Sequence, residues 1–249
     1  MYEDLAGKKI LILGASSGIG NQVARAFHEL SAEIIVTSRS REKLETNFKS
    51  LGLKSSQFQV CDNTCSESLN DLAKNIEPVD VLCVISGQSK LVPKHLLKRS
   101  LIDNQLAVNL VGPVELISLM LKYRKFREHA SIILTSAASR TGGSSTSLLY
   151  SIAKAGLTTV HKTLVEELAY SKIRINSVSF DYVKTDMTDF ILQNYERKGI
   201  PADSDTVGIS PVEATVTPFL FLASSASKWM SGQLVAADAG RQLTRATYE

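Results

Sequence analysis

Tyr150 and Lys154, in the segment YSIAK, are the two residues of this chain best suited to proton transfer. They open a long helical pattern four positions apart, so their side chains share one face of the helix. A tyrosine with its ordinary pKa of about 10 is a poor acid–base group at neutral pH. A fixed cation such as Lys154 would stabilise the phenolate and lower that pKa, and it could also hold a ribose hydroxyl. The alternative for this pair alone is a half-buried tyrosine beside a surface lysine.

Two further polar residues favour a chemical role for this pair. Ser136 ends the apolar stretch SIILTS, and its hydroxyl could donate a hydrogen bond to a substrate oxygen. Asn109 lies inside an apolar helical segment, LAVNLVGP, where a buried amide needs partners. A water molecule and Lys154 would provide them. The alternative is a polar residue that only packs between helices.

A glycine-rich turn supplies a candidate phosphate site. The segment LILGASSGIG places Gly14, Gly18 and Gly20 directly after the first predicted strand and at the start of the first predicted helix. Glycine lets the backbone turn tightly and approach a diphosphate, whose charge then meets the helix N-terminus. Glycines also serve tight turns for structural reasons alone, but a strand before and a helix after are the context of a dinucleotide site.

Residues after the second and third predicted strands suit the adenosine end of such a site. An acidic residue after the second strand would bind the ribose 2′-hydroxyl, whereas an arginine accommodates a 2′-phosphate. This chain has Ser38 and Arg39 there, which favours NADP over NAD. The alternative is that Arg39 and Arg41 only begin a solvated helix. Asp62 and Asn63 follow the third strand, where they could contact an adenine edge or serve as turn and cap residues.

A repeating pattern of strands and helices must position these candidates. Short apolar runs, several of them continuous as in strands buried on both faces, alternate with helical stretches. The predicted strands span residues 9–13, 33–37, 58–60, 81–85, 131–136, 173–178 and 232–238. The pattern predicts an α/β fold in which helices cover both faces of a parallel sheet of about seven strands. No internal repeat or linker divides the chain, so residues 1–249 are predicted to form one domain.

The segment from about residue 182 to 210 interrupts this rhythm. A long irregular connection at the C-terminal edge of a parallel sheet is typical of a lid. The next helix is predicted to begin with Ser210 as its cap, Pro211 in its first turn and Glu213 completing a capping box. The lid carries apolar residues that favour a lipophilic substrate, followed by two basic residues: Met187, Phe190, Ile191, Leu192, Tyr195, Arg197 and Lys198.

Charge and composition argue against several classes of protein. The net charge is +3, and the basic cluster LKYRKFR at 121–127 indicates a solvated helix end rather than a nucleic-acid surface. Cys61, Cys65 and Cys83 form neither a disulfide framework nor a metal motif. The N-terminus lacks the apolar run of a signal peptide, and no apolar stretch is expected to cross a membrane. A cytoplasmic protein without a metal is therefore predicted.

The segments GASSGIG and YSIAK, with Asn109 and Ser136 between them, resemble the short-chain dehydrogenase/reductase family. The resemblance covers nearly the whole chain, from about Lys8 to Gly240. It implies a Rossmann-type doubly wound fold and hydride transfer between a nicotinamide and a ketone or secondary alcohol. It also implies a homotetramer or homodimer that pairs through the fourth and fifth helices.

The resemblance assigns roles to individual residues. Tyr150 would be the general acid–base, and Ser136 would orient and polarise the substrate oxygen. Lys154 would lower the pKa of Tyr150 and bind the nicotinamide ribose, while Asn109 would hold a proton-relay water near Lys154. The cofactor-binding positions of the family correspond here to Gly14, Ser16, Ser17, Gly18, Ile19 and Gly20, with Asp62 and Asn63 near the adenine.

The chain departs from the family pattern after the fourth strand and before Tyr150. Residues 84–87 read VISG, where relatives commonly have N-N-A-G. Gly87 is kept, so the backbone can still approach the cofactor, but the lost amides weaken the polar contacts expected there. The spacing from Ser136 to Tyr150 is one residue longer than usual, which a bulged loop would absorb.

A third departure lies in SFDYVKT, residues 179–185, where Phe180 and Asp181 replace Pro-Gly. Val183 and Thr185 fall at the positions whose backbone and hydroxyl hold the nicotinamide carboxamide in the family. Asp tolerates unusual backbone conformations, so Asp181 is predicted to take a turn that glycine would normally take. Contact between Asp181 and substrate is the alternative.

These features favour an NADP-dependent reductase of ketones. A ketoacyl reductase acting on acyl-carrier protein and a small-ketone reductase are two specific possibilities. The alternative is a cofactor-binding regulator or scaffold without turnover, which the altered VISG and SFDYVKT segments favour. The complete set of four polar residues argues for the enzyme, because a pure binding protein does not need all of them.

Overall fold

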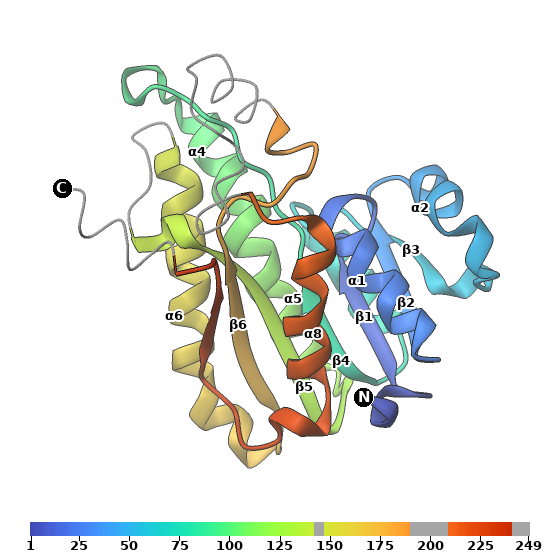
Figure 1. Cartoon of the computed structure of the whole chain (residues 1–249). Coiled ribbons are helices and arrows are strands. Elements are labelled where there is room, and N and C mark those ends of the chain that lie inside the picture. Colours follow the sequence, from blue (N-terminus) through green and yellow to red (C-terminus); the bar gives the residue numbers. More distant parts are fainter. Residues whose placement is uncertain (142–146, 190–208, 241–249) are drawn as a thin grey trace.

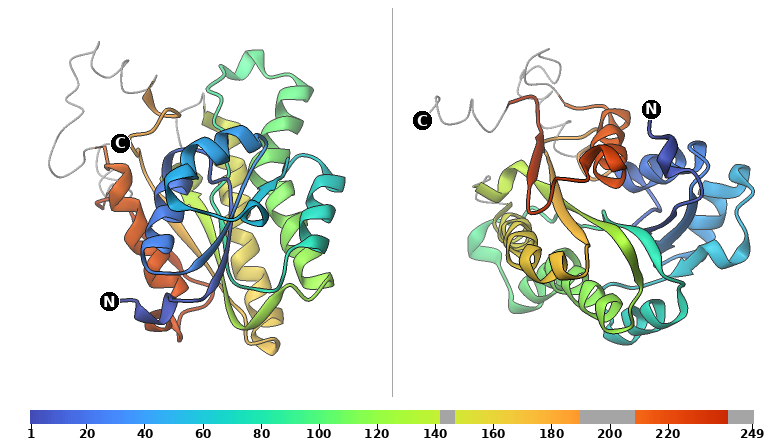
Figure 2. Two further views of the ribbon diagram at one scale, coloured as in Figure 1. Left: turned by 90° about the vertical axis from the view of Figure 1, so that its right-hand side faces the viewer. Right: turned by 90° about the horizontal axis from the view of Figure 1, so that it is seen from below.

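The computed structural model describes residues 1–141, 147–189 and 209–240. Its seven strands form one sheet with helices on both sides (Figure 1; Figure 2). The strands are β1 Lys9–Leu13, β2 Glu33–Ser38, β3 Phe58–Val60, β4 Val79–Val84, β5 Phe126–Ala137, β6 Arg174–Phe180 and β7 Leu234–Ala237. The helices are α1 Gly18–Glu29, α2 Arg41–Phe48, α3 Ser66–Asn75, α4 Arg99–Leu106, α5 Gly112–Lys122, α6 Leu148–Tyr170 and α8 Val216–Ala223.

The sheet is parallel throughout, with the strand order β3-β2-β1-β4-β5-β6-β7. This order confirms the predicted doubly wound Rossmann-type fold. The chain adds strands outward from β1 to β3, then returns to the other side of β1 with β4. In such a sheet the crevice beyond the carboxyl ends of the two strands at this reversal is the usual ligand site.

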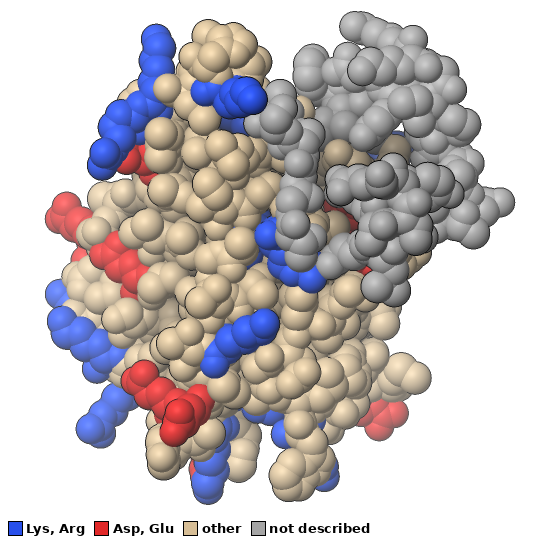
Figure 3. Space-filling view, turned by 90° about the vertical axis from the view of Figure 1, so that its left-hand side faces the viewer, with Lys and Arg blue, Asp and Glu red and all other residues tan. Residues whose placement is uncertain are grey.

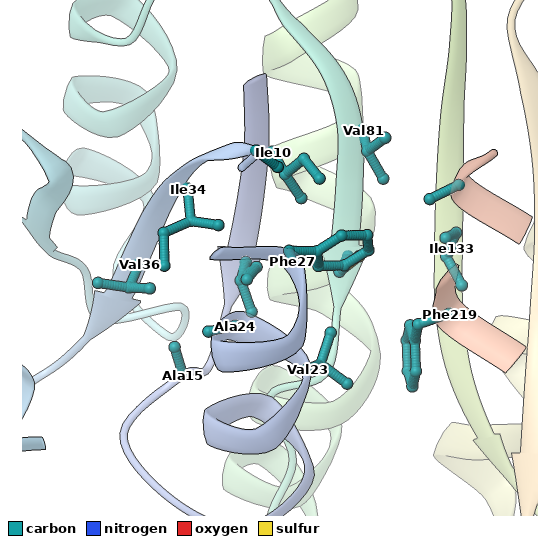
Figure 4. Close-up of a cluster of buried hydrophobic side chains, with 14 of the residues drawn as sticks. Ile10, Ala15, Val23, Ala24, Phe27, Ile34, Val36, Val81, Ile133 and Phe219 are labelled. Carbon is teal, nitrogen blue, oxygen red and sulfur yellow. The ribbon is translucent and has the colours of Figure 1, made fainter. Parts of the chain in front are cut away.

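Neighbouring residues of each central strand supply two hydrophobic cores, one on each face of the sheet. In β1, Ile10 belongs to the core that contains Phe27 of α1 and Phe219 of α8 (Figure 4). Leu11 belongs instead to the core that contains Leu157 of α6. Both faces of the sheet are thus buried, which is why the central strands are continuously apolar.

One helical segment bears on the expectation that no apolar stretch crosses a membrane. From Arg99 to Lys122, α4, a π-helical turn at Ala107–Val111 and α5 follow one another without a break. By length and composition alone this segment could cross a membrane, although the core helix of a soluble protein passes the same test. Leu116 and Met120 of α5 are buried in the core beneath it, as expected for a core helix.

The predicted capping box at Ser210 is wrong. A 3-10 turn at Val212–Thr215 precedes α8, and it has no side-chain capping hydrogen bond. Ser210 instead pairs through its backbone, donating to the Tyr182 carbonyl and accepting from the Lys184 N–H, each at 2.9 Å. Most of the predicted lid lies outside the described residues, including Phe190, Ile191, Leu192, Tyr195, Arg197 and Lys198.

Candidate active site

A pocket of about 430 Å³ lies at the carboxyl edge of the sheet, beside the ends of β1 and β2. This volume is typical of a small-molecule site. The pocket is lined by most of the residues predicted to bind a cofactor: Gly14, Ser16, Ser17, Gly18, Ile19, Gly20, Ser38, Arg39, Asn63, Gly87, Tyr150, Lys154 and Thr185. Four other predicted site residues are not in its lining: Asp62, Asn109, Ser136 and Val183.

The glycine-rich turn packs so closely against neighbouring backbone that side chains would not fit at Gly14 and Gly20. A Cβ on Gly14, whose φ is +93°, would lie 2.6 Å from the Cα of Ser86. A Cβ on Gly20 would lie 2.0 Å from the Gly14 carbonyl oxygen. Helix α1 begins here, and its cap residue Ser17 makes no side-chain capping hydrogen bond. The first N–H groups of α1 are therefore available to a diphosphate, which this turn fits.

The two arginines that follow β2 differ in their position relative to the pocket. Arg39 is exposed and lines the pocket next to Ser38. Arg41 belongs to α2 and binds elsewhere, donating to Glu45 and to the hydroxyl of Ser55, each at 2.7 Å. The solvated-helix interpretation therefore holds for Arg41, whereas Arg39 lies in the pocket lining.

Asp62 is a turn residue. Its Oδ1 accepts hydrogen bonds from the Thr64 N–H at 2.9 Å and from the Thr64 hydroxyl at 2.8 Å. The backbone hydrogen bond is the main reason that the pKa of Asp62 lies below its ordinary value, and the charge of Arg39 lowers it further. Of the two alternatives that the sequence left open for Asp62, the geometry favours the turn.

Asn63 lines the pocket but also joins three segments of the chain. Its Nδ2 donates to the Val108 carbonyl oxygen at 2.9 Å and to the Ser86 hydroxyl at 3.1 Å. The amide thereby connects the end of β3 to the VISG segment and to the π-helical turn. It supplies a polar contact at the place where the family's usual amides are missing.

Asn109 is buried in the π-helical turn, and its amide has protein partners. Its Nδ2 donates to the carbonyl oxygens of Gln88 and Gln105, and its Oδ1 accepts from the Gln88 N–H, all at 2.9 Å. A Cβ on Gly87 would lie 3.0 Å from Asn109 Oδ1 and 3.6 Å from Lys154 Nζ. The structure therefore brings Asn109 close to Lys154. The relay water remains a prediction.

Tyr150 and Lys154 both line the pocket from the N-terminal part of α6. Lys154 is only 2% exposed, and its Nζ lies 5.6 Å from the centre of the Tyr150 ring. The same ammonium group donates to the Thr135 carbonyl oxygen at 2.8 Å. The predicted side-by-side placement of phenol and ammonium is thus present in the structure.

Burial controls the titration of this pair. It raises the pKa of Tyr150 to about 12 and lowers the pKa of Lys154 to about 8. The sequence led us to expect a lowered pKa for Tyr150. In this arrangement the cost of burying a phenolate is larger than any stabilisation by Lys154, so Tyr150 keeps its proton at neutral pH.

Ser136 is turned away from the pocket. Its Oγ lies 3.0 Å from Thr158 Oγ1 and donates a longer hydrogen bond of 3.4 Å to the Lys154 carbonyl oxygen, both on α6. Along β5, Ser136 shares a face with Leu134, which belongs to the core beneath α6. The expected contact between Ser136 and a substrate oxygen remains a prediction, and this geometry does not support it.

The turn in SFDYVKT is held by packing rather than by an unusual backbone. Phe180 is the last residue of β6 and stacks on Phe219, with ring centroids 6.0 Å apart. Asp181 is not among the residues with positive φ, so the prediction that it takes a glycine-like conformation is wrong. Val183 then forms a parallel bridge with Ser210, which closes the turn.

Thr185 and Val183 have different places relative to the pocket. Thr185 lines it, and a Cβ on Gly18 would lie 3.1 Å from the Thr185 methyl group. Val183 is buried, and its carbonyl oxygen accepts a hydrogen bond from the Thr188 hydroxyl. The structure therefore brings Thr185, but not Val183, to the glycine-rich turn.

The sequence reasoning missed several residues that line the pocket. Six of them, Leu13, Thr37, Cys61, Ile85, Ser86 and Thr135, lie within two residues of the carboxyl end of a strand, and that position was the signal that could have identified them. The full set is Leu13, Thr37, Cys61, Ile85, Ser86, Gln88, Val108, Thr135, Asp186 and Met187; Met187 was assigned only to the lid. Burial raises the pKa of the Cys61 thiol to about 11, so this thiol is unreactive at neutral pH.

Comparison with known proteins identifies the class. The model of the short chain dehydrogenase family matches residues 8–196. The chain belongs to the short-chain dehydrogenase/reductase family and is an oxidoreductase.

Individual relatives cover almost the whole chain. A 3-oxoacyl-[acyl-carrier-protein] reductase FabG from Rickettsia bellii is 30% identical over 240 residues, covering 95% of this chain and 98% of the relative. L-xylulose reductase from Bos taurus is 27% identical, covering 95% of this chain and 97% of the relative. A solved structure of a putative NAD(P)-dependent gluconate 5-dehydrogenase from Beutenbergia cavernae, with bound NADP, has a TM-score of 0.87 at 23% identity and covers 96% of this chain and 98% of its own. At 23% identity, this last comparison supports the fold of the chain and nothing further.

Proposed function

We propose that this protein is an NADP-dependent reductase of ketones, or a dehydrogenase of the corresponding secondary alcohols. The observation that carries the proposal is that Tyr150 and Lys154 share one pocket with a glycine-rich turn that has no room for a side chain at Gly14 or Gly20. A diphosphate suits the turn and the N-terminus of α1. Lys154 would then hold the nicotinamide ribose, with Thr185 and Val183 at the carboxamide, as the resemblance implies.

The bound dinucleotide would supply the hydride, and this chain would supply the proton. Tyr150, with a pKa of about 12, is protonated at neutral pH and would donate its proton to the substrate oxygen. The charged ammonium of Lys154 would stabilise the phenolate that remains on Tyr150. Asn109 fixes the backbone at Gln88 and would hold a water through which the proton is replaced.

The coenzyme preference rests on Ser38 and Arg39. Arg39 lies exposed at the adenosine end of the pocket, where its guanidinium can pair with a 2′-phosphate, and the Ser38 hydroxyl can hydrogen-bond the same group. This pairing supports NADP over NAD. Asn63 lines the pocket near that end, where it would contact the adenine.

The substrate is proposed only as a carbonyl compound or its alcohol. Relatives of this chain include enzymes named for reducing 3-oxoacyl groups on acyl-carrier protein and L-xylulose. These names support a small-molecule or carrier-bound ketone as the substrate of this chain too. We propose a cytoplasmic location and no nucleic-acid partner on the sequence grounds given above.

Turnover of NADPH with ketones tests this function. The protein would be mixed with NADPH and a panel of 3-oxoacyl thioesters, keto sugars and small ketones, and the absorbance of the reduced nicotinamide followed. We expect at least one class of ketone to oxidise NADPH. Tight NADPH binding without turnover of any carbonyl compound would instead support the cofactor-binding regulator.

A homodimer or homotetramer is proposed from an exposed apolar surface on the π-helical turn, α5 and α6. The residues of this surface are Val111, Val114, Leu148 and Ile152, each more than a third exposed. Helix α6 lies on the left of Figure 1, and Figure 3 shows the face on this side, where uncharged surface lies between separate Lys and Arg side chains. Exposed apolar residues gathered on neighbouring helices favour an interface between copies of the chain.

A further inference from the structure

Strand β5 carries two adjacent hydroxyl residues at its carboxyl end, and they point in opposite directions. Successive residues of a strand face opposite sides of the sheet. Ser136 lies on the side covered by α6, where its hydroxyl has partners in Thr158 and the Lys154 backbone. Thr135 points to the other side and is part of the pocket lining.

The hydroxyl of Thr135 has no hydrogen-bond partner within the described residues of the chain. Thr135 is only 6% exposed, and its hydroxyl oxygen is itself buried. A buried hydroxyl without a partner lowers stability, whereas valine would fill nearly the same space without that cost. A side chain with a purely structural role would therefore be better apolar, and the hydroxyl indicates a partner from outside the chain.

Thr135 lies beside the nicotinamide end of the proposed site. Its carbonyl oxygen accepts a hydrogen bond of 2.8 Å from Lys154 Nζ, the group assigned above to the nicotinamide ribose. A rotation about the Cα–Cβ bond exchanges the hydroxyl and the methyl group of a threonine. The hydroxyl can thus reach a ligand in the pocket without any movement of the backbone.

We propose that the hydroxyl of Thr135 hydrogen-bonds the nicotinamide nucleoside half of the bound dinucleotide. This inference rests on the proposed function only in that the pocket binds the dinucleotide, because it makes no demand on turnover. It gives β5 a ligand contact at Thr135, while the neighbouring Ser136 is bound to α6.

Calorimetric binding of two ligands to Thr135→Val tests this contact. NADPH contains the nicotinamide nucleoside, whereas adenosine 2′,5′-bisphosphate contains only the adenosine half. Loss of one hydrogen bond should raise the Kd for NADPH about five- to tenfold, while the Kd for the bisphosphate stays unchanged. Thr135→Ser should keep the affinity of the unmodified protein for NADPH. Thr159→Val, an exposed position on α6, is the matched control and should change neither Kd.

Three results would overturn the proposal. The first is an unchanged Kd for NADPH in Thr135→Val. The second is equal weakening of both ligands, which would mean that the substitution disturbs the whole pocket. The third is an unmodified protein that does not bind NADPH at all, a result that would overturn the proposed function as well. NADPH binding without turnover would overturn the enzyme alone and leave the Thr135 contact in place.

Discussion

Lys154 carries a charge at a position that water hardly reaches, and this burial lowers its pKa from 10.5 to about 8. Below that pH the ammonium is charged and can stabilise the Tyr150 phenolate. Between the two values the unfolded chain binds a proton that the folded chain has released, so this residue makes stability rise with pH there. Near neutral pH, burial of the charged Lys154 therefore lowers the stability of the folded chain, although the proposed reaction needs this charge.

The pH dependence of reduction should follow Lys154. We expect kcat/KM for ketone reduction to be nearly constant from pH 6 to 7, and to fall as the pH rises through about 8, because Lys154 then loses its charge. Tyr150 stays protonated over this range and does not cause the decline. Initial rates in buffers of constant ionic strength measure the profile. A profile that stays flat to pH 9 would show that the charge of Lys154 is not needed.

Coenzyme preference should depend on Arg39. Arg39→Asp replaces a guanidinium that can pair with a 2′-phosphate by a carboxylate that repels it and can bind a 2′-hydroxyl. We expect the ratio of kcat/KM for NADPH to that for NADH to fall by at least about a hundredfold, as for loss of a close charge pair. Arg41→Asp is the matched control, because Arg41 binds Glu45 and Ser55 outside the pocket. An unchanged ratio in Arg39→Asp would refute the assignment.

The spacing of residues in the sequence predicted the placement of some site side chains well and of others poorly. The spacing of Tyr150 and Lys154 within one helix fixed their common face, and the structure keeps it. Ser136 could not be placed in the same way, because a shift of one residue along a strand changes the face to which a side chain points. The hydrogen bonds by which Asn63 joins Ser86 and Val108 could not be predicted either, since both partners are remote in the sequence.

Among the elements, the turn between β1 and α1 is the one on which the proposed dinucleotide site depends most. Gly14 has a φ of +93°, and a Cβ there would lie 2.6 Å from the Ser86 backbone. Gly14→Ala should therefore weaken NADPH binding by at least about tenfold, because the turn or the VISG segment must move. Titration of nicotinamide fluorescence measures the Kd.

Gly52→Ala is the control for backbone strain, because it strains the backbone without disturbing the turn between β1 and α1. Gly52 also has a positive φ, +64°, but nothing lies within 4 Å of its Cβ position. This variant should lose about 1 kcal/mol of stability and keep its affinity for NADPH. Equal loss of affinity in Gly14→Ala and Gly52→Ala would mean that general destabilisation, rather than the shape of the turn, explains the effect.

The elements themselves were largely predictable. Buried strands in a parallel sheet are continuously apolar, so β1, β2 and β4 stood out from the helical segments. The start of α8 was not predictable, because Ser210 is held by backbone pairing with Tyr182 and Lys184 across a long connection. The π-helical turn around Asn109 depends on contacts with Gln88, which no local pattern reveals.

In the whole molecule, assembly should depend on the apolar surface of the π-helical turn, α5 and α6. Val114→Arg places a charge on this surface, and burying an unpaired charge in an interface is costly. We expect sedimentation velocity to show monomers for Val114→Arg and larger species for the unmodified protein. Ser50→Arg, at an exposed position beyond α2, is the control and should not change the assembly. Identical sedimentation of all three proteins would contradict the proposed interface.

In the proposed function, Tyr150 donates the proton in an NADPH-dependent reduction. Tyr150→Phe removes the phenol oxygen and keeps the ring, so the decisive measurement is kcat/KM for reduction together with the Kd for NADPH in this variant. We expect a loss of kcat/KM of at least about a hundredfold with a nearly unchanged Kd. Retention of most of the activity, or loss of NADPH binding, would contradict this proposal, because Tyr150 would then be dispensable or structural.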